Sequence, residues 1–303
     1  MTVEGNGHKM MSTKLQGERA VSATAFACGQ SKEIGVHALA ESLNELAAAG
    51  AGAAEARVHI MIPDGYGRPR LTAVQKQIEK ACGARGVKII FLEQYKTPAA
   101  ALPLVSVTCT GTAEYTDRVI RPGQDIVLTK WAGLGGMVRI LQEKEDELEE
   151  RFAPAFIKQI KEFADEIFAG EELPAARQMG VSVFCQVTEG GIFAALWNLA
   201  REAETGLSVD MKKIPVRQET IEVCENYRLN PYQLMSAGSF LMVAENGREL
   251  ARELTGRGMK AAVIGRMTDN NDKVIQNGEE IRFIDRPAPD ELNKILGHTK
   301  RGE

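Results

Sequence analysis

Several features that would narrow the function of this 303-residue chain are missing from its sequence. Its five cysteines include no Cys-x-x-Cys pair and its four histidines are scattered, so no disulfide framework and no metal-ligand spacing is visible. No apolar run is long enough to span a membrane, and nothing resembles a signal peptide. Because the chain has a net charge of −4 and no Lys/Arg cluster, we do not expect it to bind nucleic acid. We expect a cytoplasmic protein without nucleic-acid or membrane partners, its cysteines packed as small apolar residues.

The composition that remains, 44% hydrophobic and 26% charged, is typical of a folded protein with room for two domains. Residues 1–18 are polar and are predicted to form a disordered or loose arm. The first half then predicts alternating strands and helices, in which the helices show 3.6-residue periodicity and end at glycines. The predicted strands are residues 21–27, 57–62, 87–92, 104–112 and 126–130, and the predicted helices are residues 34–49 and 71–85.

The second half begins with a segment, residues 135–170, that is predicted to be wholly helical, with a solvated charged face. Alternation then resumes, and Asn277-Gly278 between two apolar stretches predicts a β-hairpin. The predicted strands are residues 181–187, 207–210, 239–243 and 261–267, and the predicted helices are residues 192–204, 218–227, 248–254 and 289–296.

The most informative stretch is Thr188, Glu189, Gly190 and Gly191, between the strand 181–187 and the helix that follows. Thr188 is a suitable N-cap, and the two glycines let main-chain N–H groups approach a ligand. A helix start of this kind carries partial positive charge and favours phosphate. An ordinary strand–turn–helix corner explains the same pattern and stays open.

Two further loops have a similar composition. One follows the strand 126–130 and offers Lys130, Gly133, Gly135 and Gly136; the other offers Ser236 and Gly238 ahead of the strand 239–243. Such loops suit the cradling of phosphate oxygens, and the Lys130 ammonium would add a positive charge. Neither matches the P-loop pattern or G-x-G-x-x-G, so each loop alone is also explained as a structural corner.

The ordered combination of segments resembles a family, the AIR-synthase-related proteins. The segments that carry the resemblance are residues 124–133 (QDIVLTKWAG), 187–197 (VTEGGIFAALW), 214–220 (IPVRQET), 236–241 (SAGSFL) and 261–268 (AAVIGRMT). The similarity covers most of the chain from about residue 34 to residue 283 and is strongest after residue 124.

The resemblance implies an α+β, two-domain architecture: an N-terminal sheet with helices that dimerises, residues 19–133, and a C-terminal α/β sandwich, residues 134–303. It implies a homodimer in which the N-terminal sheets form a shared barrel. It also implies ATP and Mg²⁺ in a cleft between the domains, with a small phosphate-bearing ligand and phosphoryl transfer to a substrate oxygen. The phosphate-binding residues it implies are Lys130, Gly133, Gly135, Gly136, Thr188, Glu189, Gly190, Gly191, Ser236 and Gly238.

The chain also departs from the family pattern where acidic residues are expected. Residues 26–30 (FACGQ) hold no carboxylate, and Gln186 stands where the family has aspartate. Mg²⁺ prefers oxygen ligands, and Glu45 and Glu93 are the carboxylates left to supply them, although each is also explained as a structural or exposed glutamate. The C-terminal cysteine of the hydrogenase maturation factor is missing, so carbamoyl chemistry is not expected. Two functions stay open: a phosphoryl-transfer enzyme, or a catalytically reduced homologue that binds a ligand or a protein partner as a dimer.

Overall fold

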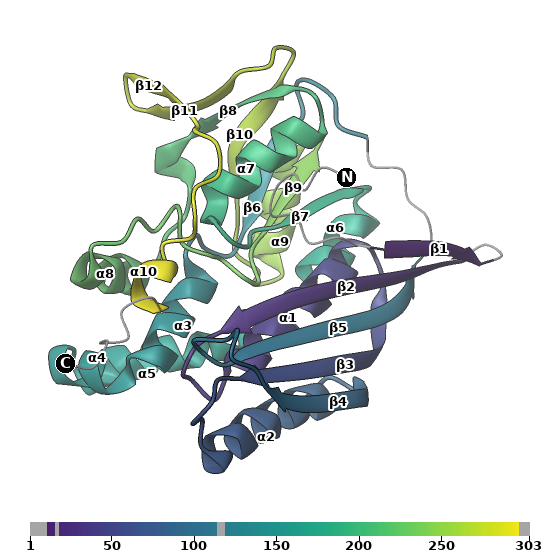
Figure 1. Ribbon diagram of the computed structural model, residues 1–303. Coiled ribbons are helices and arrows are strands. Elements are labelled where there is room, and N and C mark those ends of the chain that lie inside the picture. Colours follow the sequence, from purple (N-terminus) through teal and green to yellow (C-terminus); the bar gives the residue numbers. More distant parts are fainter. Residues whose placement is uncertain (1–10, 16–17, 114–118, 297–303) are drawn as a thin grey trace. The chain divides into compact units, whose positions relative to one another are not determined.

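The chain divides after Tyr115 into a first unit, Met1–Tyr115, and a second unit, Thr116–Glu303, each built on its own sheet (Figure 1). The structure, a computed structural model, describes residues 11–15, 18–113 and 119–296. The predicted boundary after residue 133 lies too far along the chain. Strand β6 (Asp125–Thr129) pairs with β9 (Phe240–Ala244) and β10 (Ala261–Thr268), so it is a central strand of the second sheet.

The first unit is a five-stranded sheet in the order β1-β2-β5-β3-β4. Its elements are β1 (Met11–Leu15), β2 (Glu18–Cys28), α1 (Ile34–Ala48), β3 (Gly52–Ile62), α2 (Arg68–Ala84), β4 (Lys88–Lys96) and β5 (Leu104–Ala113). Strand β4 lies parallel to β3, and α2 makes the crossover between them. Part of the predicted loose arm is therefore ordered as β1, which pairs with β2; residues 1–10 and 16–17 lie outside the described residues.

The two faces of this first sheet differ in chemistry. Alternate residues such as Ala25, Val58 and Val107 are buried beneath α1, because strand side chains point to opposite faces in turn. The other face carries hydroxyls and rings, among them Thr24, which hydrogen-bonds Thr108 across the sheet at 2.8 Å. Three large apolar side chains are exposed there: Phe26 (55%), Phe91 (42%) and Tyr95 (38%). We call this surface the open face of the first unit.

The second unit is a seven-stranded mixed sheet in the order β12-β11-β8-β10-β6-β9-β7. Besides β6, β9 and β10 it contains β7 (Val183–Gln186), β8 (Gly206–Asp210), β11 (Lys273–Asn277) and β12 (Glu280–Phe283). The predicted hairpin at Asn277-Gly278 is confirmed: Gly278 has φ +67° and Asn277 pairs with Glu280.

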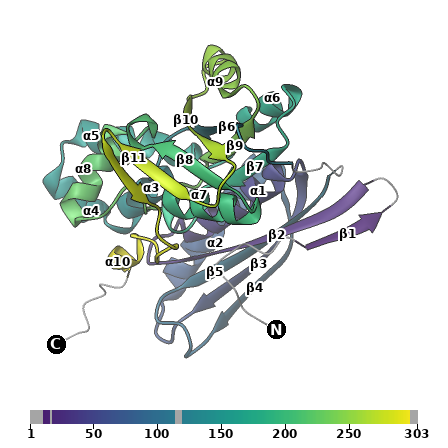
Figure 2. The same ribbon diagram turned by 90° about the horizontal axis from the view of Figure 1, so that it is seen from above.

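Helix α7 (Gly191–Glu202) covers one face of this sheet (Figures 1 and 2). Its apolar side, including Ile192, Leu196 and Leu199, packs with strand residues such as Leu128 and Val209 in one buried cluster. The other helices of this unit are α3 (Leu134–Glu143), α4 (Glu145–Arg151), α5 (Pro154–Glu162), α6 (Glu172–Gln178), α8 (Gln218–Tyr227), α9 (Gly247–Gly256) and α10 (Asn293–Leu296), with single turns η1 (Phe163–Asp165) and η2 (Met211–Lys213).

Two helix predictions need correction. The segment 135–170 is not one helix: it breaks at Lys144 and again at Phe152 and Ala153, where Pro154 starts α5 because proline favours the first turn of a helix. The last helix is four residues, Asn293–Leu296, rather than the predicted 289–296. None of the helices among the described residues is long and apolar enough to cross a membrane.

Candidate functional site

The three predicted loops meet at the ends of β6, β7 and β9. Val187 donates its main-chain N–H to the oxygen of Ser239 (2.9 Å) and accepts the N–H of Ser236 (3.2 Å). The Gly133 N–H reaches the Ser236 hydroxyl at 2.7 Å. Segments more than 100 residues apart in the chain therefore form one junction, which we call the loop junction (residues 130–136, 188–191 and 234–239).

The glycines of the loop junction are required by close packing. A Cβ on Gly135 would lie 2.6 Å from the N atom of Ala237, and a Cβ on Gly136 would collide with the Leu234 side chain. Gly133 and Gly238 have φ of +74° and +91°, and a Cβ on Gly238 would collide with the main-chain oxygen of Glu166. The space that these glycines leave is filled by neighbouring protein atoms.

The hydrogen-bonding groups of this part of the junction have partners within the chain. Ser236 is fully buried, and its hydroxyl both accepts the Gly133 N–H and donates to the oxygen of Leu234. The Gly136 N–H donates to the oxygen of Met235 at 2.8 Å. In the structure these groups hold α3 against residues 234–237. The ligand role predicted for them stays a prediction.

Lys130 does not extend toward the α7 start. Its ammonium donates to the main-chain oxygens of Glu166 (2.8 Å) and Phe168 (2.7 Å). It also lies 3.5 Å from carboxylate oxygens of Glu166 and Glu172, and Glu172 is itself buried. With those acceptors around it, the buried ammonium holds the turn after α5 in place.

Helix α7 starts differently from the prediction. Its N-cap is Gly190, with φ +79°, and Thr188 contributes only its main-chain oxygen, which accepts the Gly191 N–H at 3.0 Å. Gly191, with φ +66°, lies so close to residues 232–234 that a Cβ would be 2.6 Å from the oxygen of Tyr232. Two consecutive left-handed residues explain why both positions are glycine.

A carboxylate of the chain's own C-terminal segment occupies the α7 start. Asp290 accepts the Gly190 N–H at 2.7 Å through Oδ2 and the Leu292 N–H at 2.8 Å through Oδ1. Burial raises the pKa of Asp290 from its ordinary value of 3.8 to about 7, although both hydrogen bonds oppose this shift. Asp290 is therefore the group that accepts the Gly190 N–H, and the phosphate role of this loop stays a prediction.

Two main-chain donors at the α7 start are not used within the described part of the chain. No described residue accepts a hydrogen bond from the main-chain N–H of Glu189 or Ile192. A cavity of about 290 Å³ lies beside Gly190, and its lining includes Asn230, Gln233 and Arg286. These are donors of the kind that bind a phosphate group.

Gln186, at the end of β7, is the buried polar side chain that stands out near the junction. It is 4% exposed, and neither its Oε1 nor its Nε2 has a hydrogen-bond partner among the described residues. Burying an amide without hydrogen-bond partners is unfavourable by about 1–3 kcal/mol, so Gln186 lowers the free energy of unfolding by about that amount.

The two predicted metal ligands lie on different layers of the first unit. Glu45 belongs to α1, which covers the buried face of the sheet. On β4, Gln94 contacts Gln75 of α2, so the neighbouring Glu93 points to the open face, where its strand partner is His59. The residues 20–113 and 119–296 contain no group of three or more His, Cys, Asp or Glu side chains that could hold a metal ion. Glu45 and Glu93 therefore do not form a shared Mg²⁺ site.

Sequence reasoning missed Asp290 and Arg286. Asp290 follows Pro289 shortly before a short helix, a pattern typical of an N-cap, but no spacing rule links it to a glycine 100 residues earlier. Arg286 lies in a polar and proline-containing stretch without periodicity.

Two domain models of one protein family match this chain, each over a separate part of it. The sequence model described as "AIR synthase related protein, C-terminal domain" matches residues 121–277, and the one described as "AIR synthase related protein, N-terminal domain" matches residues 2–113.

Curated relatives divide into two groups. Carbamoyl dehydratase HypE of Rhodobacter capsulatus is 25% identical over 77% of this chain and 69% of its own length. Phosphoribosylformylglycinamidine synthase subunit PurL of Methanopyrus kandleri is 28% identical over 59% of this chain. The match covers only 25% of the length of that PurL, so this chain corresponds to a part of it.

Solved structures share the fold. HypE of E. coli superimposes with a TM-score of 0.72 at 17% identity, covering 92% of this chain and 89% of that one. ThiL from Aquifex aeolicus, complexed with AMPPCP and TMP, gives a TM-score of 0.69 at 15% identity, covering 90% and 89%. A hydrogenase maturation protein HypE in complex with ATP gives 0.66 at 17% identity, covering 90% and 87%.

Proposed function

Because the chain belongs to the AIR synthase related family, we propose that it binds ATP or another phosphate ligand and activates a small substrate by phosphoryl transfer. The observation that carries the proposal is the α7 start, where the N–H groups of Glu189 and Ile192 have no acceptor among the described residues. HypE in complex with ATP and ThiL with AMPPCP share the fold, which supports a nucleotide as the ligand.

In this proposal the phosphate lies at the α7 start. The N–H groups of Glu189 and Ile192 donate to its oxygens, and Arg286 supplies charge from the cavity beside Gly190. At about 290 Å³ the cavity is at the lower limit for a small-molecule site, so we assign it the phosphate part of the ligand alone. ATP would supply the transferable phosphoryl group.

Two carboxylates oppose anion binding there. Asp290 faces the Gly190 N–H, and the charge of Glu189 contributes to the raised pKa of Asp290, which places the two carboxylates within electrostatic range. Protonation of Asp290 near neutral pH would remove one of the two negative charges. The proposal therefore carries a pH dependence: phosphate binding is tighter at pH 6 than at pH 8.

The experiment is a calorimetric titration with ATP, with and without Mg²⁺, of the wild type, Arg286→Gln and a control, Arg257→Gln. Arg257 is paired with Glu253 at the end of α9 and does not line the cavity. We expect ATP to bind the wild type and the control alike, and Arg286→Gln to bind at least fivefold more weakly. Absence of heat at millimolar ATP in both conditions would remove the nucleotide from the proposal.

A catalytically reduced homologue is the second candidate, and three observations favour it. Lys130 is held by main-chain oxygens, the junction glycines are packed, and Glu45 and Glu93 do not share a metal site. Such a protein would bind a ligand or a protein partner without turnover. The discriminating measurement is release of ADP or phosphate on incubation with ATP: ATP binding without release in a screen of small oxygen-bearing substrates favours the reduced homologue.

We also propose a cytoplasmic homodimer formed through the open face of the first unit. Phe26, Phe91 and Tyr95 expose large apolar area there, and His59 packs against both Phe91 and Tyr95 with ring centroids 5.2 and 6.3 Å away. An exposed apolar sheet face of this kind is commonly a protein interface. All five cysteines are free thiols, which suits a reducing compartment. Light scattering should give a dimer for the wild type and a monomer for Phe26→Glu.

A further inference from the structure

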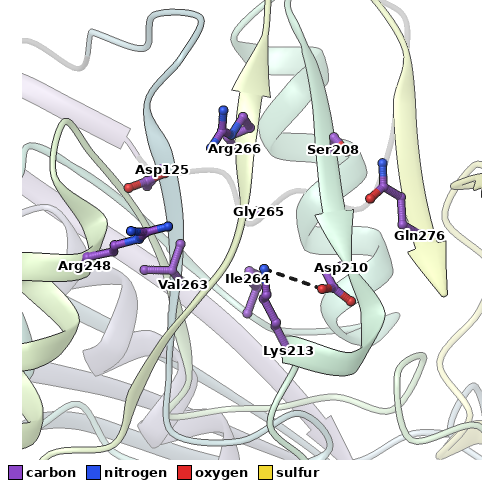
Figure 3. Close-up of a pocket in the computed structure, with 10 residues that line it drawn as sticks. All are labelled: Asp125, Ser208, Asp210, Lys213, Arg248, Val263, Ile264, Gly265, Arg266 and Gln276. Atoms are coloured by element: carbon purple, nitrogen blue, oxygen red, sulfur yellow. Dashed lines mark ion pairs between the residues drawn. The ribbon is translucent and has the colours of Figure 1, made fainter. Parts of the chain in front are cut away.

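A larger hollow, of about 530 Å³, lies elsewhere in the second unit, on the sheet face opposite α7 (Figure 3). Leu207, Val209 and Met267 point into the core beneath α7. The residues that alternate with them, Ser208, Asp210 and Arg266, point to the other face and line the hollow. No residue of the α7 start lines this hollow, so it is separate from the site proposed above.

The side chains that line this hollow carry a formal net charge of +1, from Lys213, Arg248 and Arg266 against Asp125 and Asp210. Asp125 accepts the N–H of Gly247 at 3.0 Å, and Asp210 lies 3.5 Å from the ammonium of Lys213. Arg248 and Arg266 have no hydrogen-bond or ion-pair partner among the described residues. In Figure 3, Arg248, Arg266 and Lys213 lie around the hollow on three different sides. Two unpaired guanidinium groups thus face a space whose carboxylates are already engaged.

The main chain of β10 is irregular where it borders the hollow. Strand β10 shifts its register against β6 between Val263 and Gly265, a β-bulge, and such bulges are frequent next to ligand sites. Gly265 lines the hollow with main chain alone, and a Cβ there would collide with the main-chain oxygen of Ser208. No larger residue fits at that position, because its Cβ would also lie 2.8 Å from the Cα of Val209.

Neutral polar groups complete the lining. The Ser208 hydroxyl and the Gln276 amide lie on the side of the hollow away from Arg248 (Figure 3). Guanidinium groups match phosphate oxygens in geometry, and hydroxyl and amide groups suit the hydroxyls of a sugar. The volume falls in the range of small-molecule sites, so there is room for more than a bare phosphate ion.

We propose that this hollow binds a small phosphate monoester of sugar-phosphate size, with its phosphate between Arg248 and Arg266 and its hydroxyls toward Ser208 and Gln276. The ligand is a dianion near neutral pH, and the guanidinium groups of Arg248 and Arg266 pair with its phosphate oxygens. The site is independent of nucleotide binding at α7.

The test is a calorimetric titration with glucose 6-phosphate, inorganic phosphate and glucose. The proteins are the wild type, the double variant Arg248→Gln/Arg266→Gln, and the control Arg252→Gln, which removes an exposed α9 charge that does not line the hollow. We expect glucose 6-phosphate to bind the wild type and the control alike, at least tenfold more tightly than inorganic phosphate. The double variant should bind it at least tenfold more weakly, and glucose should not bind.

Three results would overturn the proposal: no binding of glucose 6-phosphate by the wild type at 10 mM, equal binding by the double variant, or an equal loss in Arg252→Gln. Circular dichroism of the double variant checks that the fold is retained, which we expect because both arginines are exposed. Because Arg286→Gln is predicted to leave glucose 6-phosphate binding unchanged, failure of the nucleotide proposal and failure of this one give different patterns.

Discussion

The loop junction and the hollow on β10 both contain groups suited to bind phosphate, but they differ in whether those groups have partners within the protein. At the junction, glycines and a lysine look like a phosphate cradle in the sequence, yet their space and hydrogen bonds are largely taken by the chain itself. At the hollow, the sequence shows no recognisable motif, yet Arg248 and Arg266 have no partner in the described part of the chain. Glycine-rich loops at strand ends therefore indicate close main-chain packing. They indicate ligand binding only where hydrogen-bond donors have no acceptor within the protein.

The largest expected effect tests the packing role of the junction glycines. Gly191→Ala should lower the free energy of unfolding by about 3–5 kcal/mol, because left-handed backbone strain adds to a clash with Tyr232. The matched control is Gly258→Ala, which has φ +82° but nothing within 4 Å of its Cβ, and should lose only about 1–2 kcal/mol. Urea denaturation measures both; equal losses would mean that packing is not the reason for Gly191.

A somewhat smaller loss is expected for Lys130→Met. It leaves two main-chain oxygens without their donor and the buried Glu172 without its cation, which should cost about 2–4 kcal/mol. Lys130→Met/Glu172→Gln should recover part of that loss, since the buried charge is then gone as well. If Lys130→Met instead kept full stability and lost ATP affinity, the lysine would be a ligand group after all.

The pH dependence of stability tests the carboxylate at the α7 start. The folded pKa of Asp290, about 7, lies above the ordinary 3.8, so the folded state holds the proton more tightly than the unfolded state. Its contribution is therefore favourable at low pH and is lost as the pH rises from about 4 to 7, by at most ~1.4 kcal/mol per pH unit.

Asp290→Asn should remove that slope from urea-denaturation curves measured between pH 4.5 and 8. The control Asp269→Asn, at an exposed position, should keep the wild-type slope. If Asp290→Asn and wild type showed parallel pH profiles, the carboxylate would not be held in the buried environment described for it.

The smallest effect concerns the neutral side of the hollow. Ser208→Ala should weaken glucose 6-phosphate about fivefold, the loss of one hydrogen bond of about 1 kcal/mol, and leave inorganic phosphate unchanged. Calorimetric titration measures both ligands. An equal weakening of both would place the phosphate, rather than the sugar, next to Ser208.

Periodicity and turn chemistry predicted most of the fold. The 3.6-residue pattern located α8 at its observed bounds, and Asn277-Gly278 located the β11–β12 hairpin, because both depend on neighbouring residues. The domain boundary was wrong because β6 is a buried strand whose sequence suits either sheet, and only its partners β9 and β10 decide the matter. The 135–170 segment was mistaken for one helix although Pro154 is a start signal.

The candidate site was predicted in part for the same reason. Composition selected three loops that the structure brings together at the junction, and their ligand role stays a prediction. Composition could not show that Lys130 turns toward the oxygens of Glu166 and Phe168. Asp290 and the two unpaired arginines depend on contacts between distant segments, which a single sequence does not reveal.

Hydrogen–deuterium exchange, measured with saturating ATP and separately with glucose 6-phosphate, tests most directly whether the second unit holds two distinct anion sites. We expect ATP to slow exchange in residues 188–196, at the α7 start, and glucose 6-phosphate to slow exchange in residues 206–213 and 261–268, at the hollow. Slowing of the same segments by both ligands, or of neither region by either, would contradict that expectation.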